Sequence, residues 1–215
     1  MTCQHCAANA PRHHDGAQWI HPLGGDDVVC GFQEDVGREG DWIQTWTGRQ
    51  FWAREPRPED FHILDIAAGM RNPRYSNQCI LTETVGEHSV LMWREAMRRG
   101  YDARLRRAVL LHDCSEPYLI DVPRPIKRDL RDYLDIEDRI MRAAAVRFDF
   151  DWPMPAQVKE LDNRILNDEL AQNMAPPIAP WRQLDGGPLG ITLGNWPPEI
   201  AFICFLHACA VERLI

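Results

Sequence analysis

Apolar side chains recur at spacings of three and four residues along most of the second half of the chain. This periodicity predicts amphipathic helices, because residues three and four apart share one face of an α-helix. The segments with this pattern are 85–99, 103 to about 115, 130–148 and 155–174. A shorter helix is expected at 61–70, and an apolar helix at 199–215 is expected to pack on the core. The pattern predicts an all-α fold.

Local signals place several of the helix ends. Asp60 and Asp102 stand just before apolar-periodic segments, where a carboxylate can cap the first turn. Gly100 supplies a stop after the segment 85–99. Pro117 is expected to close the helix that begins at Ala103 and to exclude its continuation.

Three segments lack a helical pattern. Residues 42–52 alternate bulky and polar side chains, which indicates a short strand or hairpin. Residues 174–198 are dense in Pro and Gly and predict a loop or small hairpin that could cover a site. Residues 1–41 show no sustained period and are interpreted as an irregular arm. We therefore expect an arm, 1–41, followed by one domain, 42–215.

Composition narrows the classes of protein. A chain of 215 residues with 45% hydrophobic residues can bury one sizeable core. Its net charge of −8 argues against the broad basic face that long nucleic acid requires, but leaves a nucleotide-sized ligand open. The sequence holds neither an apolar run of about 18 residues nor the pattern of a signal peptide, so we expect a cytoplasmic protein without a membrane partner.

The arm is rich in cysteine and histidine. The chain has seven cysteines, an odd number, and their wide spacing predicts reduced thiols rather than a disulfide scaffold. Cys3 and Cys6, with neighbouring histidines, could supply a zinc site, although the spacings fit no standard finger. The competing interpretation is a disordered arm.

Four residues carry the strongest chemical signal. Imidazole nitrogens and carboxylate oxygens from three predicted helices form a mixed donor set that suits Mn²⁺, Co²⁺, Fe²⁺, Ni²⁺ or Zn²⁺, with Mg²⁺ also open. They are His88, His112, Asp113 and Asp162. In an octahedral ion these four ligands would leave positions for a water and a phosphate oxygen.

A His-Asp pair alone is weak evidence, since a second one occurs at His14 and Asp15. Only the pair at 112–113 ends an apolar run, AVLLHD, and has an acidic residue, Glu116, three positions later. A lone histidine such as His88 is more often a core residue than a ligand. The combination of all four residues favours the metal site.

The runs EHSVLMW, RRAVLLHDCSEPYLIDVPRPIK and KELDNRIL resemble the HD-domain metal-dependent phosphohydrolases. Within that superfamily they are most similar to bacterial 5′-deoxynucleotidases and phage deoxynucleotide phosphohydrolases. The resemblance extends over about residues 42–170 and more weakly into the C-terminal helix. It implies an HD-type helical bundle in which His88 is the first metal-binding histidine, His112 and Asp113 are the HD pair, and Asp162 is the distal ligand.

The resemblance also implies catalytic roles. Glu116 matches the acid that assists proton transfer, and Asp121 matches the acid of the segment GDxPxPxK, in which Ile120 here replaces Gly. An arginine ahead of the first histidine usually contacts phosphate, and Arg74 or Arg71 could serve.

Basic residues follow the HD segment. Arg124 and Lys127 could neutralise a phosphate near the site. The alternative is that they pair on the surface with Glu116 and Asp121, which would then have no site role.

The predicted function is hydrolysis of a small nucleotide phosphate ester, foremost a deoxynucleoside 5′-monophosphate to deoxynucleoside and phosphate. Alternatives are a deoxynucleoside triphosphate triphosphohydrolase and, from another class, a non-catalytic metal- and nucleotide-binding sensor. The sequence leaves base preference, sugar preference and the metal open.

The C-terminal helix could contribute to a homodimer. The tryptophans are expected to pack in the core, and one of them could stack on a base.

Overall fold

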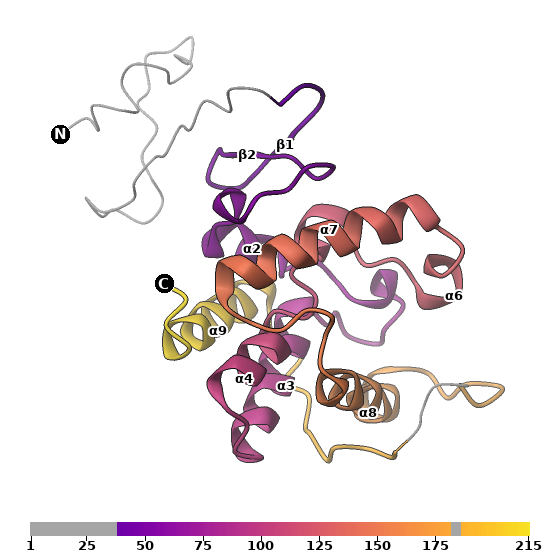
Figure 1. Ribbon diagram of the computed structural model, residues 1–215. Coiled ribbons are helices and arrows are strands. Elements are labelled where there is room, and N and C mark those ends of the chain that lie inside the picture. Colours follow the sequence, from indigo (N-terminus) through magenta and orange to yellow (C-terminus); the bar gives the residue numbers. More distant parts are fainter. Residues whose placement is uncertain (1–37, 182–185) are drawn as a thin grey trace, which may run out of the picture.

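The computed structural model describes residues 38–181 and 186–215 (Figure 1). This part of the chain is mostly helical, which confirms the all-α class. Its helices are α2 (Ile63–Gly69), α3 (Val85–Arg98), α4 (Ala103–Leu110), α5 (Glu116–Leu119), α6 (Arg124–Lys127), α7 (Arg131–Phe148), α8 (Ala156–Asn173) and α9 (Pro198–Val211). Two short 3-10 helices, η1 (Pro58–Asp60) and η2 (Tyr75–Asn77), complete the helical elements. The arm predicted for 1–41, with its alternative zinc site, lies almost wholly outside the described residues.

A two-stranded hairpin precedes the helices. Strands β1 (Ile43–Gln44) and β2 (Gln50–Phe51) pair antiparallel, with Ile43 opposite Phe51, as the alternation in 42–52 predicted. Phe51 is fully buried and stacks on Tyr118 at a ring-centroid distance of 3.6 Å. The hairpin is thereby joined to the helical core.

Helix α3 lies at the centre of the core and packs against α4, α8 and α9. Its N-cap is Thr84, whose hydroxyl accepts a hydrogen bond from the backbone N–H of Glu87 at 3.1 Å. Nearly all of the first three turns is buried, His88 included. Neighbouring helices therefore surround the first turn of α3, which carries His88.

Two local predictions were wrong. Helix α4 ends at Leu110 rather than near 115, and Pro117 lies in the first turn of α5, where its missing N–H has no intrahelical role. Asp60 does not cap α2, because its carboxylate binds the Arg38 guanidinium at 2.7 and 2.9 Å. His62 is the N-cap instead. The predicted cap at Asp102 is confirmed by its hydrogen bond with the N–H of Leu105.

The described part of the Pro/Gly-rich segment 174–197 is a loop without regular structure, one of the two forms predicted. Carboxylates hold it against the helices. Glu87 of α3 accepts the backbone N–H groups of Gly194 and Trp196, each at 2.7 Å. Asp168 of α8 accepts two further backbone N–H groups of the loop at 2.7 and 3.0 Å. Because Glu87 precedes His88, the loop is fixed to the turn of α3 that carries this histidine.

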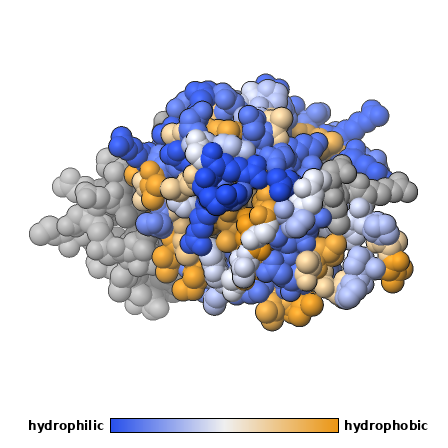
Figure 2. All heavy atoms as spheres, turned by 90° about the horizontal axis from the view of Figure 1, so that it is seen from below, coloured by the Kyte–Doolittle hydropathy of each residue, from blue (hydrophilic) through white to orange (hydrophobic). Residues whose placement is uncertain are grey.

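The face drawn in Figure 2 is a mixture of hydrophilic and apolar residues, with the apolar side chains in separate groups. Among the helices of the described residues, none combines the length and the apolar character that crossing a membrane requires.

Candidate metal centre

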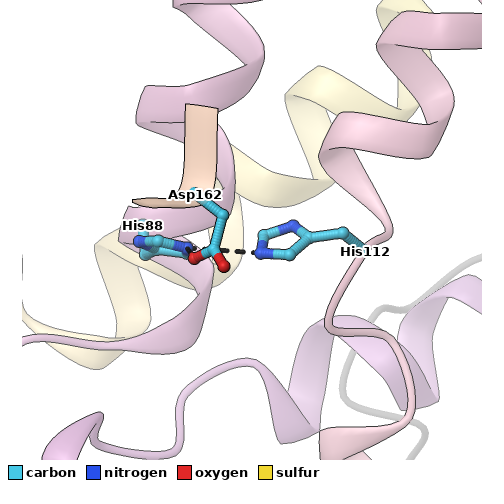
Figure 3. Close-up of side chains that lie close together, drawn as sticks. All are labelled: His88, His112 and Asp162. Atoms are coloured by element: carbon cyan, nitrogen blue, oxygen red, sulfur yellow. Dashed lines mark hydrogen bonds and ion pairs between the residues drawn. The ribbon is translucent and has the colours of Figure 1, made fainter. Parts of the chain in front are cut away.

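Three segments distant in sequence bring His88, His112 and Asp162 together (Figure 3). His88 comes from α3, Asp162 from α8, and His112 from the turn after α4 rather than from a helix. The Nε2 atoms of the two histidines are 3.3 Å apart, and His88 Nε2 is 3.5 Å from Asp162 Oδ1. The structure thus places three of the four predicted ligands around one point.

Hydrogen bonds at the far side of each imidazole fix which nitrogen faces this point. His112 Nδ1 donates to the Val109 carbonyl at 2.8 Å, and His88 Nδ1 donates to the Glu169 carboxylate at 2.6 Å. In the neutral rings both Nε2 atoms therefore carry lone pairs, and these lone pairs point toward each other. Two facing acceptors at 3.3 Å need a proton or a cation between them, and a histidine oriented by a carboxylate or carbonyl is the usual arrangement in metal sites.

Asp113, the fourth predicted ligand, lies beside the histidines. Its Oδ2 is 3.0 Å from His112 Nε2 and 4.0 Å from His88 Nε2. Burial opposes ionisation of Asp113, but His112 and His88 outweigh it and lower the pKa of this carboxyl. Burial likewise opposes the charged form of His112, yet Asp113 and Asp162 raise its pKa. The cluster therefore combines two imidazoles with an ionised carboxylate.

Asp162 carries a second negative charge into the cluster. Burial alone would raise its pKa, but the hydrogen bond with His88 and the charge of His112 lower it below its usual range. Two carboxylates and two imidazole lone pairs form a donor set typical of divalent transition-metal sites. These residues fit a resident cation.

Glu169 on α8 is a buried residue that the sequence analysis did not single out. One of its oxygens binds His88, and the other contacts Arg74 Nη2 at 3.3 Å and the Tyr75 hydroxyl. Burial opposes its charge, but Arg74 and His88 hold the pKa of Glu169 well below its usual range. Its spacing of seven residues from Asp162, which places both on one helix face, is the sequence signal that could have found it.

The structure distinguishes the two candidate arginines. Arg74 is buried, and its Nη1 lies 3.6 Å from Asp113 Oδ2 while Nε lies 3.9 Å from Glu83 Oε1. The surrounding carboxylates raise the pKa of Arg74 in spite of its burial. The Arg71 guanidinium instead lies 5.6 Å from the ring centre of Phe202 on α9. Arg74 belongs to the cluster, and the structure does not place Arg71 there.

Glu83 is a second buried acidic residue next to Arg74. Burial and the charge of Glu169 raise its pKa, so this carboxyl holds its proton at neutral pH. Its Oε2 also accepts the side-chain amide of Asn173 at 3.3 Å. Glu83, His88 and Glu169 form a second group with metal-ligand atoms, but the Arg74 guanidinium already supplies positive charge there.

Glu116 begins α5 and is buried, with only 6% of its surface exposed. Its Oε2 has no hydrogen-bond partner among the described residues. Burial, together with the negative charges of Asp113 and Asp121, raises the pKa of Glu116 well above its usual value. Burial and these two charges therefore favour the protonated form of Glu116, although the helix expected to carry it beside His112 is interrupted.

Ile120 stands where the HD resemblance expects glycine, and its backbone has a positive φ. Ile120 adopts φ 66° and ψ 149°, a conformation that favours glycine and costs other residues about 1–3 kcal/mol. Its carbonyl accepts the Tyr133 hydroxyl at 2.8 Å. The following residue, Asp121, accepts the backbone N–H of Tyr75 at 3.3 Å. The backbone keeps the shape of a glycine turn, and Asp121 reaches the segment that carries Arg74.

The two basic residues of α6 have separate partners. Arg124 contacts the Asp162 carboxylate and donates to Asn163 Oδ1 at 3.0 Å. Lys127 pairs with Glu137 on α7 at 2.6 Å. Arg124 thus lies at the cluster through a predicted metal ligand, whereas Lys127 is held mainly by α7.

The fold and this site define an all-α protein with a buried group of histidines and carboxylates that could hold a divalent cation.

No family model matches the chain. It is 33% identical over 124 residues to an uncharacterized protein of Rhodobacter capsulatus, a match that covers 55% of this chain and 63% of the relative. It is 28% identical over 149 residues to the uncharacterized protein YfdR of Escherichia coli, covering 68% of this chain and 80% of that protein. Neither name states an activity.

Proposed function

We propose that this protein is a metal-dependent phosphohydrolase of the HD-domain type, acting on a small nucleotide phosphate ester. A deoxynucleoside 5′-monophosphate is the foremost substrate, with deoxynucleoside and phosphate as products. The observation that carries the proposal is the pair of imidazole Nε2 atoms 3.3 Å apart, flanked by the carboxylates of Asp113 and Asp162. These are the four residues that the HD resemblance assigns to the metal.

The donor set favours a transition-metal ion over an ion that prefers oxygen ligands alone. Imidazole nitrogens favour Mn²⁺, Co²⁺, Fe²⁺, Ni²⁺ or Zn²⁺, whereas Mg²⁺ prefers oxygen and water. His88, His112, Asp113 and Asp162 would hold the ion. When bound, such an ion supplies Lewis acidity at a phosphoryl oxygen and lowers the pKa of water.

The surrounding residues support phosphate chemistry. Arg74 presents a buried, permanently charged guanidinium beside Asp113, and such a group can bind phosphate oxygens in pairs. The raised pKa of the buried Glu116 favours its protonated form, so it is suited to protonate the leaving alkoxide oxygen of the ester. Asp121 positions the turn that carries Arg74 by accepting the N–H of Tyr75.

The test is phosphate release from deoxy- and ribonucleoside mono- and triphosphates in the presence of Mn²⁺. We expect the parent protein to release phosphate and Asp113→Ala to lose at least about a hundredfold in rate, since removal of a ligand removes the ion. Asp135→Ala, which changes an exposed aspartate on α7, is the matched control and should retain full activity.

The products distinguish the nucleotidase from the triphosphohydrolase. Phosphate from monophosphates supports the nucleotidase, and triphosphate from triphosphates would replace it with the triphosphohydrolase. If Mn²⁺ binds but no substrate is hydrolysed, the proposal is wrong and a metal- and nucleotide-binding sensor takes its place.

A further inference from the structure

Tyr75 is held rigidly at the edge of the candidate metal centre. Its backbone N–H donates to Asp121, and its hydroxyl contacts Glu169 and lies 3.3 Å from Arg74 Nη2. The backbone from Tyr75 to Asn77 has φ of 54°, 51° and 60°, a left-handed turn that allows the amide and the phenol to reach these partners together. The buried guanidinium of Arg74 lies over this ring, 5.0 Å from its centroid.

Trp181 extends this edge from another part of the chain. It lies on the Pro/Gly-rich segment that follows α8 (Figure 1), and its ring centre is 6.2 Å from that of Tyr75, at an interplanar angle of 56°. The side chain is 37% exposed. Two tilted rings at this distance contact at their edges, so neither ring covers a whole face of the other.

We propose that Tyr75 and Trp181 form an aromatic subsite that binds the planar base of the substrate, with little discrimination between bases. This inference rests on the proposed function and adds the residues that recognise the nucleoside. The phosphate would lie toward Arg74 and the metal ligands, and the base would stack on the partly exposed Trp181, with the Tyr75 ring beside it. Stacking on an aromatic ring contributes about 1–3 kcal/mol per base and tolerates any sequence, because every base has a π-face.

The hydrogen bonds of Tyr75 account for the weak base selectivity. Base identity is read through donors and acceptors at the base edge. The Tyr75 hydroxyl is already engaged with Glu169 and Arg74. The Tyr75 hydroxyl is therefore not available to read a base edge, and discrimination between bases should be small compared with discrimination against a substrate that has no base.

The experiment compares dAMP and dTMP with 2-deoxyribose 5-phosphate, which lacks a base, in Mn²⁺. Trp181→Leu should raise KM about five- to a hundredfold for both nucleotides, leave kcat nearly unchanged, and leave kcat/KM for the sugar phosphate unchanged. Trp181→Phe, which keeps a ring, should retain most of the nucleotide affinity. Trp42→Leu, at an exposed tryptophan next to the hairpin, is the matched control and should change none of these values.

An equal loss for nucleotides and for the sugar phosphate would overturn the inference, because it would indicate a general disturbance of the site. Unchanged nucleotide KM values in Trp181→Leu would overturn it as well, and in that case the hydrolytic function would stand.

Binding of deoxyadenosine, followed by saturation-transfer NMR, separates this inference from the proposed function. If no ester is hydrolysed but the base protons receive saturation in the parent and not in Trp181→Leu, the aromatic subsite is supported and the hydrolytic function fails. If no ester is hydrolysed and the base protons receive no saturation in the parent, both are wrong.

Discussion

At the scale of single residues, Glu169 connects the parts of the site. Its two oxygens bind the outer nitrogen of His88, the guanidinium of Arg74 and the hydroxyl of Tyr75. An ionised carboxylate in this position keeps the Nε2 lone pair of His88 directed at the cluster and balances the charge of Arg74. In the proposed function, the orientation of His88 toward the metal and of Arg74 toward the phosphate would both depend on this one buried carboxylate.

The two buried glutamates around Arg74 should respond differently to the same substitution. Glu169→Gln removes the negative charge that His88, Arg74 and Tyr75 all contact, and breaking such a buried pair costs about 3–5 kcal/mol in free energy of unfolding. Glu83→Gln replaces a carboxyl that already holds its proton, so we expect little loss. Urea unfolding of the metal-free proteins at about pH 7 measures both.

Equal destabilisation by the two variants would contradict this assignment of charges. It would mean that Glu83 is ionised and shares the balancing of Arg74. Similar stability of Glu169→Gln and the parent would show that Glu169 does not carry the charge described above.

The residue scale is also where the sequence was most informative. His88, His112, Asp113 and Asp162 could be named from residue type, context and the HD resemblance, and the structure places them together. Glu83 and Tyr75 could not, because ordinary acidic and aromatic residues acquire a role only when packing brings α8 against the segment before α3. For Glu169, the sequence signal was its seven-residue spacing from Asp162. Arg71 and Arg74 had equal standing in sequence, and only the direction of each side chain separates them.

At the scale of elements, the periodicity predicted the long helices but missed one interruption. The run AVLLHD continues the apolar pattern of α4, yet the helix ends at Leu110. The His112 ring N–H donates a hydrogen bond to the carbonyl of Val109. In a continuing helix, this carbonyl would instead accept the backbone N–H of Asp113. A side-chain hydrogen bond of this kind leaves no trace in hydrophobic periodicity, and it is what turns His112 toward His88.

The end of α3 is tied to α8 by an ion network that should make stability depend on pH. The hydrogen bonds from Arg98, helped by those from Arg99, lower the pKa of Glu95 to about 2, and Arg99 also binds Glu160 on α8 at 2.8 Å. In the unfolded chain a glutamate titrates near about 4.3. Because the folded value is the lower one, the stabilisation is present above about pH 4.3 and is lost as the pH falls toward 2.

Glu95→Gln should therefore be less stable than the parent at about pH 5.5, and the difference should shrink progressively as the pH falls through about 4 to 3. Asp135→Asn, at an exposed aspartate, provides the comparison for general effects of removing a charge. Chemical unfolding of the three proteins at these pH values gives the result. A difference between Glu95→Gln and the parent that is the same at every pH would show that the network does not act through the charge of Glu95.

At the scale of the whole molecule, one core organises the described residues. Helix α3 is surrounded by α4, α8 and α9, so the elements that supply His88, His112 and Asp162 are held by the same packing. The Pro/Gly-rich loop was predictable from composition, but its attachment to Glu87 and Asp168 was not, because carboxylates that accept backbone N–H groups have no spacing rule across distant segments. Exposed apolar residues on α9 leave the homodimer a prediction.

In the proposed function, the histidines and aspartates of α3, α8 and the turn after α4 hold one divalent cation. Counting bound Mn²⁺ by electron paramagnetic resonance on the full chain tests it most directly, because Mn²⁺ prefers these ligands to the thiols of residues 1–41. We predict one tightly bound Mn²⁺ per chain in the parent and in Asp135→Ala, and none in His112→Ala. Absence of a bound ion in the parent, or an unchanged count in His112→Ala, would show that these residues do not form the metal site.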